Sequence, residues 1–205
     1  MSAYRDYVSD FPQRCSVLLR RLRFPARGMR LEVTHLLSIT TVGLIVPHER
    51  LKRLNEESQA PHPSGDRHRY KEAASEYNRL LEEAFLSSPL WPDGKATWRK
   101  GKVKDVGAQA PNFDQAFAGA EPMLPNVRAG TVVNIMRNAL AHGNIVTGGR
   151  DINDIMFLSR DTPPSYRFVA VEPEDLHEFM MNYFEFLGRL DLGSGKLVGG
   201  APEAA

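Results

Sequence analysis

Apolar residues recur at every third or fourth position in five stretches of this chain, a spacing that predicts amphipathic helices. The five stretches are residues 10–23, 31–46, 68–86, 128–142 and 172–189. Asp10 followed by Pro12 has the pattern of a helix start, and Gly143 lies where a left-handed C-cap is expected. Pro47 is expected to end the second helix, because proline lacks the amide hydrogen that helical hydrogen bonds need. Two shorter stretches, 49–55 and 112–120, are also predicted to be helical.

One β-hairpin is predicted late in the chain. The segments 155–158 and 166–171 are rich in β-branched and aromatic residues, and the turn-forming sequence 160–165 separates them. The helix predicted at 172–189 follows this hairpin directly. From residue 191 onwards glycine and alanine dominate, so we expect a flexible tail over 191–205.

Residues 87–106 differ from the rest of the chain and are predicted to form a long surface insertion. The segment holds two prolines, two glycines and two tryptophans among several basic residues. Proteins that bind single-stranded RNA interleave aromatic and basic residues in this way. The candidate RNA contacts are Trp91, Lys95, Trp98, Arg99, Lys100 and Lys102. The alternative is a solvated loop whose tryptophans pack on the helices.

The composition of the 205 residues is that of an ordinary globular domain, with 42% hydrophobic and 25% charged residues. The formal net charge is +1, so bulk charge gives no argument for a nucleic-acid or membrane partner. The charges are unevenly spread, however. Residues 1–30 hold seven Arg against two Asp, whereas residues 150–190 hold eight acidic residues against four Arg. A nearly neutral chain can therefore still present a basic surface to RNA.

Cysteine and hydropathy patterns indicate a cytoplasmic protein with no membrane partner. Cys15 is the only cysteine, which excludes an intrachain disulfide, and it is interpreted as a small core residue. Residues 1–10 lack the apolar core of a signal peptide. The most apolar run, residues 36–46, is about half the length that spans a bilayer. The histidines show no metal-ligand spacing, so neither a metal nor another cofactor is expected.

The most informative motif is Arg137-Asn138-Ala139-Leu140-Ala141-His142-Gly143. On a helix, Asn138 and His142 share a face, and the long side chain of Arg137 can reach the same site. The negative end of the helix dipole favours a protonated imidazole at His142, which suits general acid–base chemistry. An arginine within reach suits an anionic phosphate. The alternative interpretation is a buried polar network that holds helices together.

This motif resembles the signature of the HEPN superfamily, an arginine followed by four to six residues and a histidine. The resemblance extends over residues 10–190 and includes the opening helices, with Thr34-His35-Leu36-Leu37 and Val46-Pro47-His48-Glu49-Arg50-Leu51. It implies a mainly α fold, an up-and-down helical bundle with one small β-hairpin before the C-terminal helix. We therefore expect one HEPN-like domain at 1–190, with the insertion around 87–106.

The resemblance also implies a function. Many HEPN proteins are metal-independent endoribonucleases that dimerise around the motif helix and act as toxins or in defence. By this analogy His142 would transfer a proton, Arg137 would stabilise charge on the phosphate, and Asn138 would orient the pair or the substrate. His35, His48 and Glu49 lie near the end of the second predicted helix, which is expected to approach the motif. Of these, His48 and Glu49 are candidate supporting residues, and the alternative for each is a surface or capping role.

The resemblance to the HEPN superfamily does not determine the partner or whether this protein is active. An antitoxin or operon partner is expected for a toxin. Members paired with a nucleotidyltransferase antitoxin often carry a tyrosine two residues after the histidine, where this chain has Asn144. HEPN-like modules without activity also exist, so a non-catalytic dimerisation or adaptor module is the alternative to the ribonuclease. A helical bundle that binds a small ligand in a closed apolar pocket is a third class.

Overall fold

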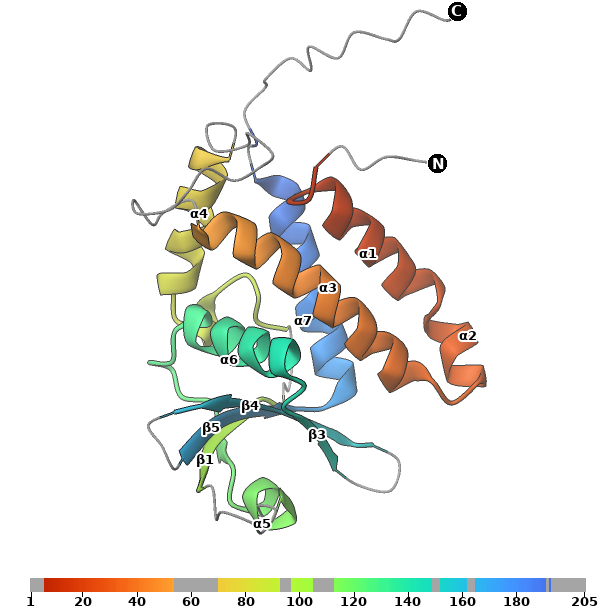
Figure 1. Ribbon diagram of the computed structural model, residues 1–205, viewed down its shortest axis with the longest axis vertical. Helices are drawn as coiled ribbons and strands as arrows, with labels where there is room; N and C mark the ends of the chain where they lie inside the picture. Colours follow the sequence, from red (N-terminus) through yellow and green to blue (C-terminus); the bar gives the residue numbers. More distant parts are fainter. Residues whose placement is uncertain are drawn as a thin grey trace, which may run out of the picture.

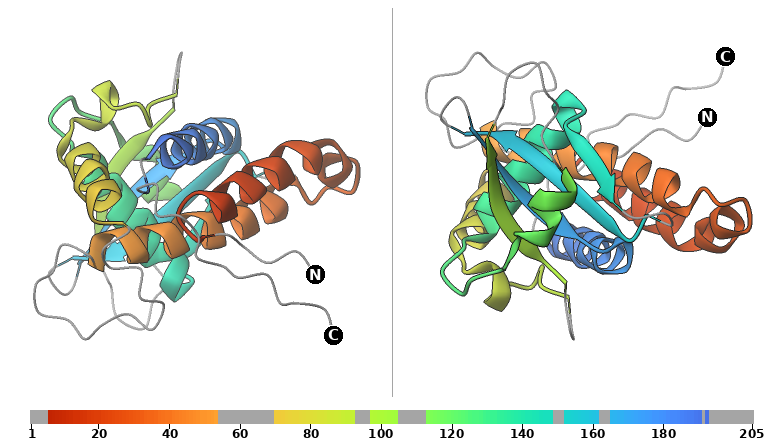
Figure 2. Two further views of the ribbon diagram at one scale, coloured as in Figure 1. Left: turned by 90° about the horizontal axis from the view of Figure 1, so that it is seen from above. Right: turned by 90° about the horizontal axis from the view of Figure 1, so that it is seen from below.

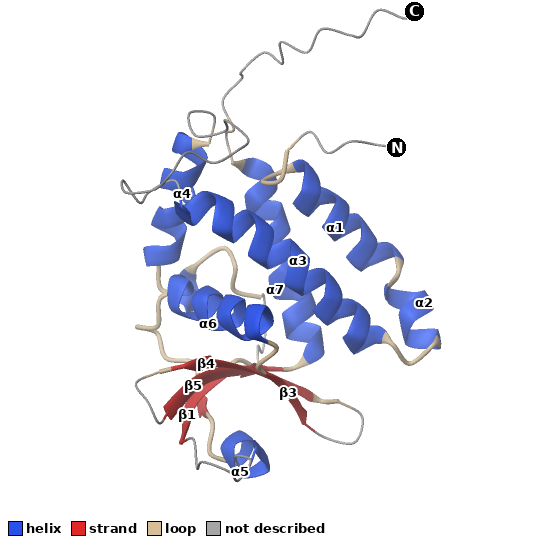
Figure 3. Ribbon diagram, viewed as in Figure 1, coloured by secondary structure: helices blue, strands red, loops and turns tan. Residues whose placement is uncertain are grey.

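The computed structural model describes residues 6–53, 70–92, 97–104, 113–148, 152–161, 165–190 and 192. A layer of helices covers one face of an antiparallel sheet, and one short helix lies against the other face (Figure 1, Figure 3). The α-helices are α1 Asp10–Arg21, α2 Arg23–Gly28, α3 Glu32–Arg53, α4 Lys71–Glu82, α5 Phe113–Ala118, α6 Ala129–His142 and α7 Pro173–Arg189, with a 3-10 turn at Phe85–Ser87. The strands are β1 Arg99–Lys104, β2 Glu121–Pro122, β3 Ile145–Gly148, β4 Asp154–Arg160 and β5 Ser165–Val171. The mainly α class is thus confirmed.

The predicted helices form close to their expected positions because their apolar faces are buried together. Tyr77 and Leu80 of α4 and Leu176 and Phe179 of α7 belong to one large hydrophobic cluster. Among the described residues, no helix has the combined length and hydrophobicity needed to cross a membrane.

α3 is one continuous helix, which shows that the expected stop at Pro47 is wrong. A proline inside a helix removes the hydrogen bond to the carbonyl four residues earlier, here Gly43. The helix continues because its apolar face is held on both sides of the proline: Leu44 and Leu51 are both fully buried. The predicted stretch 49–55 is therefore the end of α3 as far as Arg53, and its last residues lie outside the described part. This continuity places His48 and Glu49 on the same helix as Leu44.

Within the described ranges the sheet has five strands in the order β2-β1-β5-β4-β3, and each neighbouring pair is antiparallel. The predicted hairpin is present as β4 and β5, in register from Ile155 opposite Val171 to Arg160 opposite Tyr166. The expectation of a single hairpin is nevertheless wrong, because β1, β2 and β3 extend it on both sides.

β1 lies inside the segment that was predicted to be a surface insertion. It pairs along its whole length with β5, from Arg99 opposite Ala170 to Lys104 opposite Ser165. Val103 is its one aliphatic residue, so the strand lacks the alternation of apolar and polar residues that would reveal it. The segment forms a strand because its backbone pairs with β5. β2 pairs with only the first two residues of β1, so among the described residues no strand pairs with the rest of β1 on that side. Lysines on such an edge discourage pairing with other chains.

The sheet also explains why the helices do not form the expected up-and-down bundle. α6 packs on α3 and α4 on one side and on β4 and β5 on the other. Apolar residues of the sheet thus supply part of the core that a bundle would fill with helices alone. Figure 2 shows α5 on the opposite face of the strands, where Phe117 packs in a second, smaller cluster.

Alternation along β4 assigns its residues to these two faces. Ile155 and Phe157 belong to the large cluster beneath the helices, whereas Met156 and Leu158 belong to the cluster beneath α5. By the same alternation, Ser159 lies on the helical face and Arg160 on the α5 face. β3 pairs with β4 from Asp154 to Phe157, and the amide of Leu158 donates one more hydrogen bond of 3.0 Å to the carbonyl of Asn144. Among the described residues, no strand pairs with Ser159 or Arg160 on this side of β4.

Candidate functional site

α6 positions the Arg137–His142 motif, and it ends where the sequence predicts. Gly143 adopts the left-handed conformation with φ of 68°, a region that glycine occupies without steric cost. The amide of Gly143 and the amide of Asn144, the latter at 2.8 Å, both donate to the carbonyl of Ala139. This cap ends the helix at His142 and turns the chain into β3. The imidazole therefore lies at the junction between the helical layer and the sheet.

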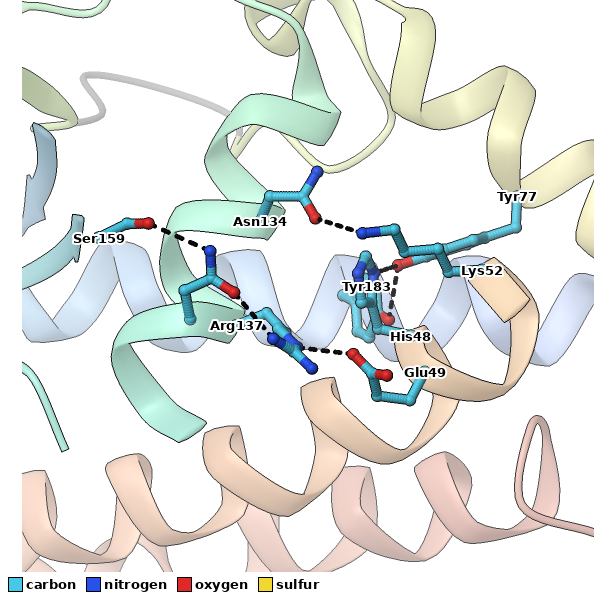
Figure 4. A network of polar contacts seen from close by, with 9 residues as sticks. His48, Glu49, Lys52, Tyr77, Asn134, Arg137, Ser159 and Tyr183 are labelled. Atoms are coloured by element: carbon cyan, nitrogen blue, oxygen red, sulfur yellow. Dashed lines mark hydrogen bonds and ion pairs between the residues drawn. The ribbon is translucent and has the colours of Figure 1, made fainter. Parts of the chain in front are cut away.

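Arg137 is held by two side chains (Figure 4). Its Nε donates a hydrogen bond of 2.6 Å to Oε1 of Glu49 on α3, and its Nη1 donates one of 2.9 Å to Oδ1 of Asn138. The side chains of Arg137 and Glu49 are 29% and 22% exposed, so the pair is partly shielded from water. A charge-assisted bond in such surroundings is stronger than one on the open surface. It fixes the orientation of the guanidinium relative to α3.

Asn138 extends this network to the sheet. Its Nδ2 donates to Oγ of Ser159 at 3.1 Å, and Ser159 is only 3% exposed. The chain of contacts Glu49–Arg137–Asn138–Ser159 thus links α3, α6 and β4. Figure 4 labels Glu49, Arg137 and Ser159 of this chain. Both ends of the Asn138 amide are engaged, which fixes its orientation.

His48 lies next to Glu49 in the sequence but belongs to a separate buried network. Its Nδ1 is 2.7 Å from the hydroxyl of Tyr77, which in turn lies 3.1 Å from the hydroxyl of Tyr183 (Figure 4). Burial, reinforced by the charge of Lys52, lowers the pKa of His48 to about 4. Burial also raises the pKa of Tyr77 and of Tyr183. All three groups are therefore neutral at physiological pH, and the network has a structural character.

His142 lines a pocket of about 380 Å³ beside the last residues of β4. The other lining residues are Asn138, Asn144, Leu158, Ser159, Arg160 and Tyr166. His142 is exposed, and within the described part of the chain its side chain has no hydrogen-bond or ion-pair partner. Arg137 does not line this pocket. The structure thus brings His142 and Asn138 together at a cavity and places Arg137 behind Asn138.

The candidate RNA contacts around β1 have diverse environments. Trp98 is 2% exposed and packs against the rings of Phe85 and Phe179, so it is a core residue. Trp91 is half-buried with its ring edge-on to Phe85. These positions agree with the alternative that the tryptophans pack on the helices.

Three of the four basic candidates lie on β1. Arg99 is ion-paired with Asp154, Lys100 is half-buried, and Lys102 is 73% exposed with its Nζ 3.1 Å from Asp161. Lys95 lies outside the described residues.

Two residues of the pocket, Arg160 and Tyr166, were not singled out from the sequence. They flank the turn of the predicted hairpin, and no motif includes them. Their proximity to His142 depends on the register of β4 and β5 and on the end of the β3 pairing, neither of which a sequence pattern fixes. The one sequence feature that could have indicated these two residues is the hairpin, because the residues on either side of its turn lie opposite one another.

His35 and Cys15 lie away from the His142 pocket. His35 lines a different pocket, of about 560 Å³, together with His177 and Arg23. Cys15 is buried, and burial raises the pKa of its thiol to about 11, as expected for a core residue. In the part of the chain that the structure describes, no three His, Cys, Asp or Glu side chains are grouped so that they could hold a metal ion.

The motif at the end of α6, with its arginine fixed and its histidine open to a pocket, defines a HEPN-type module. Residues 1–191 match the family model described as HEPN pEK499 p136, and the chain belongs to this family. The resemblance found in the sequence is thereby confirmed. No curated protein and no solved structure matched the chain.

Proposed function

We propose that this protein is a metal-independent endoribonuclease of the HEPN type that acts on RNA as a toxin or defence effector. The observation that carries the proposal is a contrast between two side chains of α6, of which one is exposed at a pocket and the other is held in place by hydrogen bonds. His142 is exposed at a pocket, with no side-chain partner among the described residues, whereas Arg137 is held by Glu49 and Asn138. A group that exchanges protons with a substrate needs access, and a group that stabilises charge benefits from a fixed position.

The chemistry uses the substrate's own nucleophile. The ribose 2′-hydroxyl attacks the adjacent phosphorus, the new O2′–P bond forms, and the P–O5′ bond breaks. The products are a 2′,3′-cyclic phosphate and a free 5′-hydroxyl. The 2′-hydroxyl loses its proton and the departing O5′ gains one, and His142 transfers a proton in this exchange. Arg137 stabilises the negative charge that develops on the phosphate oxygens. Asn138 orients Arg137 through Oδ1. RNA is distinguished from DNA because DNA lacks the attacking hydroxyl.

A homodimer that joins two motif helices completes the proposal. Two α6 helices that face one another would combine His142 of one protomer and Arg137 of the other in a composite cleft. This arrangement accounts for the position of Arg137, which lies outside the lining of the pocket beside His142 within one protomer. An antitoxin or another operon product is the expected partner that restrains the activity.

The test is cleavage of single-stranded RNA in EDTA by the wild type, Arg137→Ala and His142→Ala. We expect cleavage by the wild type, a loss of at least about a hundredfold in each variant, and no cleavage of a substrate in which every ribose is 2′-deoxy. Arg189→Gln, which removes an exposed arginine at the far end of α7, serves as the control. Cleavage that persists unchanged in both motif variants would overturn the proposal.

One observation favours a non-catalytic dimerisation or adaptor module instead. The two hydrogen bonds that Arg137 makes among the described residues go to side chains of the protein, as in a network that holds elements together. This alternative predicts no cleavage at any pH and loss of the dimer in Arg137→Ala. Size-exclusion chromatography separates the two functions: a variant that stays dimeric but loses cleavage supports the enzyme.

A further inference from the structure

We propose that Arg160 and Tyr166 form a nucleotide subsite beside His142, in which Arg160 binds a backbone phosphate and Tyr166 stacks on an RNA base. This inference rests on the proposed function and names the part of the substrate that the pocket takes. The subsite lies on β4 and β5, outside the Arg137–His142 motif. It contributes the positive charge of Arg160 to the pocket.

Among the described residues, Arg160 is the one guanidinium that lines the pocket with His142. It is the last residue of β4 and is exposed, and no hydrogen bond or ion pair engages its side chain within the described residues. Arg137, by contrast, is neutralised by Glu49 and does not line the pocket. The described residues that line the pocket include no carboxylate. A phosphate that enters it therefore meets an unpaired guanidinium, which can bind two phosphate oxygens at once.

Tyr166 lies directly opposite Arg160 in the register of β4 and β5. Residues opposite one another in an antiparallel pair project on the same face, so the ring and the guanidinium are neighbours. Tyr166 is half-buried and packs against the cluster under α5 that includes Phe168 and Leu158. One part of the ring is thus held by the protein while another part lines the pocket. A ring held in this way can stack on a base at a low cost in conformational entropy.

The rest of the lining fits a nucleotide in chemistry and size. Asn144 presents an amide, which can bind a base edge or a ribose hydroxyl, and Leu158 adds an apolar surface. A volume of about 380 Å³ lies in the range of small-molecule sites. A base that stacks on Tyr166 must be unstacked from its own strand, so the substrate class is single-stranded or looped RNA.

Binding can be measured apart from cleavage with a single-stranded 2′-O-methyl oligoribonucleotide. This probe lacks the attacking hydroxyl, and a 2-aminopurine base in it reports stacking through its fluorescence. We expect Arg160→Gln to weaken binding about tenfold, since a hydrogen bond to a charged group is lost. Tyr166→Ala should weaken binding by a similar factor and abolish the fluorescence change, whereas Tyr166→Phe should retain both. Arg189→Gln is the charge-matched control and should bind like the wild type.

The outcomes separate this inference from the proposed function. If the wild type binds the probe in an Arg160-dependent manner but cleaves no all-ribose RNA, the ribonuclease fails and the subsite stands. If the wild type cleaves RNA but Arg160→Gln and Tyr166→Ala bind the probe like the wild type, the subsite fails. No probe binding by the wild type, or equal loss in Tyr166→Phe and Tyr166→Ala, also overturns the subsite. Thermal unfolding of each variant confirms that it is folded.

Discussion

Nε of Arg137 lies 2.6 Å from Oε1 of Glu49, so a residue on α6 and a residue on α3 that are 88 positions apart are joined by a charged hydrogen bond. Because Arg137 also donates to Asn138, one carboxylate and one amide together fix the guanidinium. The pair couples the stability of the fold to the position of the motif. Changes at Glu49 should therefore alter both.

Replacing Glu49 with Gln is expected to lower the free energy of unfolding by about 1.5 kcal/mol, since a charged hydrogen bond becomes a neutral one. It should also reduce RNA cleavage about tenfold in kcat, because Arg137 loses its anchor. Urea denaturation and single-turnover cleavage measure the two effects. The matched control is Glu185→Gln, which breaks the exposed Glu185–Arg189 pair and should cost less than about 0.5 kcal/mol. Equal effects of the two substitutions would contradict this prediction.

His48 is expected to make the protein less stable in mild acid. Its pKa is about 4 in the folded state and lies near 6.5 when the chain is unfolded. Between these values the unfolded state binds the extra proton, so the stability contributed by neutral His48 is full above pH 6.5 and is lost as the pH falls towards 4. The loss between pH 7.5 and pH 5 should be about 2 kcal/mol. His177, whose pKa is also lowered, acts in the same direction.

Urea denaturation of the wild type and of His48→Gln at the two pH values checks this assignment. The glutamine variant cannot take up the proton and should have a flatter pH dependence, even if it is less stable at pH 7.5. If the free energy of unfolding changed with pH to the same extent in the variant and the wild type, His48 would not be the titrating group.

Gly143→Ala is expected to lower the free energy of unfolding by about 1 kcal/mol, because alanine is strained at φ of 68°. No neighbouring atom lies within 4 Å of the added methyl group, so the cost comes from the backbone alone. Gly28→Ala is the matched control: its methyl group also meets nothing within 4 Å, and φ there is not in the left-handed region. Alanine at that helical position should be neutral or stabilising. Thermal unfolding of both variants gives the comparison, and equal shifts would argue against a strained cap.

Trp98→Phe is expected to destabilise the protein by about 1–3 kcal/mol while leaving RNA binding unchanged, because the indole is enclosed by Phe85 and Phe179. Anisotropy with the 2′-O-methyl probe measures binding, and urea denaturation measures stability. If Trp98→Phe weakened binding of the probe without changing the free energy of unfolding, Trp98 would instead be an RNA contact.

The sequence by itself determined most helices and the motif. Periodic apolar positions predicted α1, α4, α6 and α7 within a few residues, because burial of one face is encoded locally. Gly143 and the Arg137–His142 spacing predicted where α6 ends and which polar groups lie there. The hairpin of β4 and β5 was also readable from local composition.

Only the tertiary structure decided the rest, because it depends on contacts between distant segments. The strand at Lys100 exists through backbone pairing with Val169, which leaves no hydrophobic pattern in its sequence. α3 continues through Pro47 because packing on both sides outweighs one lost hydrogen bond. Glu49 joins Arg137, and Arg160 lines the pocket of His142, through the packing of α3 on α6 and the register of β4 and β5. Sequence spacing names the residue types of a site, whereas three-dimensional packing decides which of them share it.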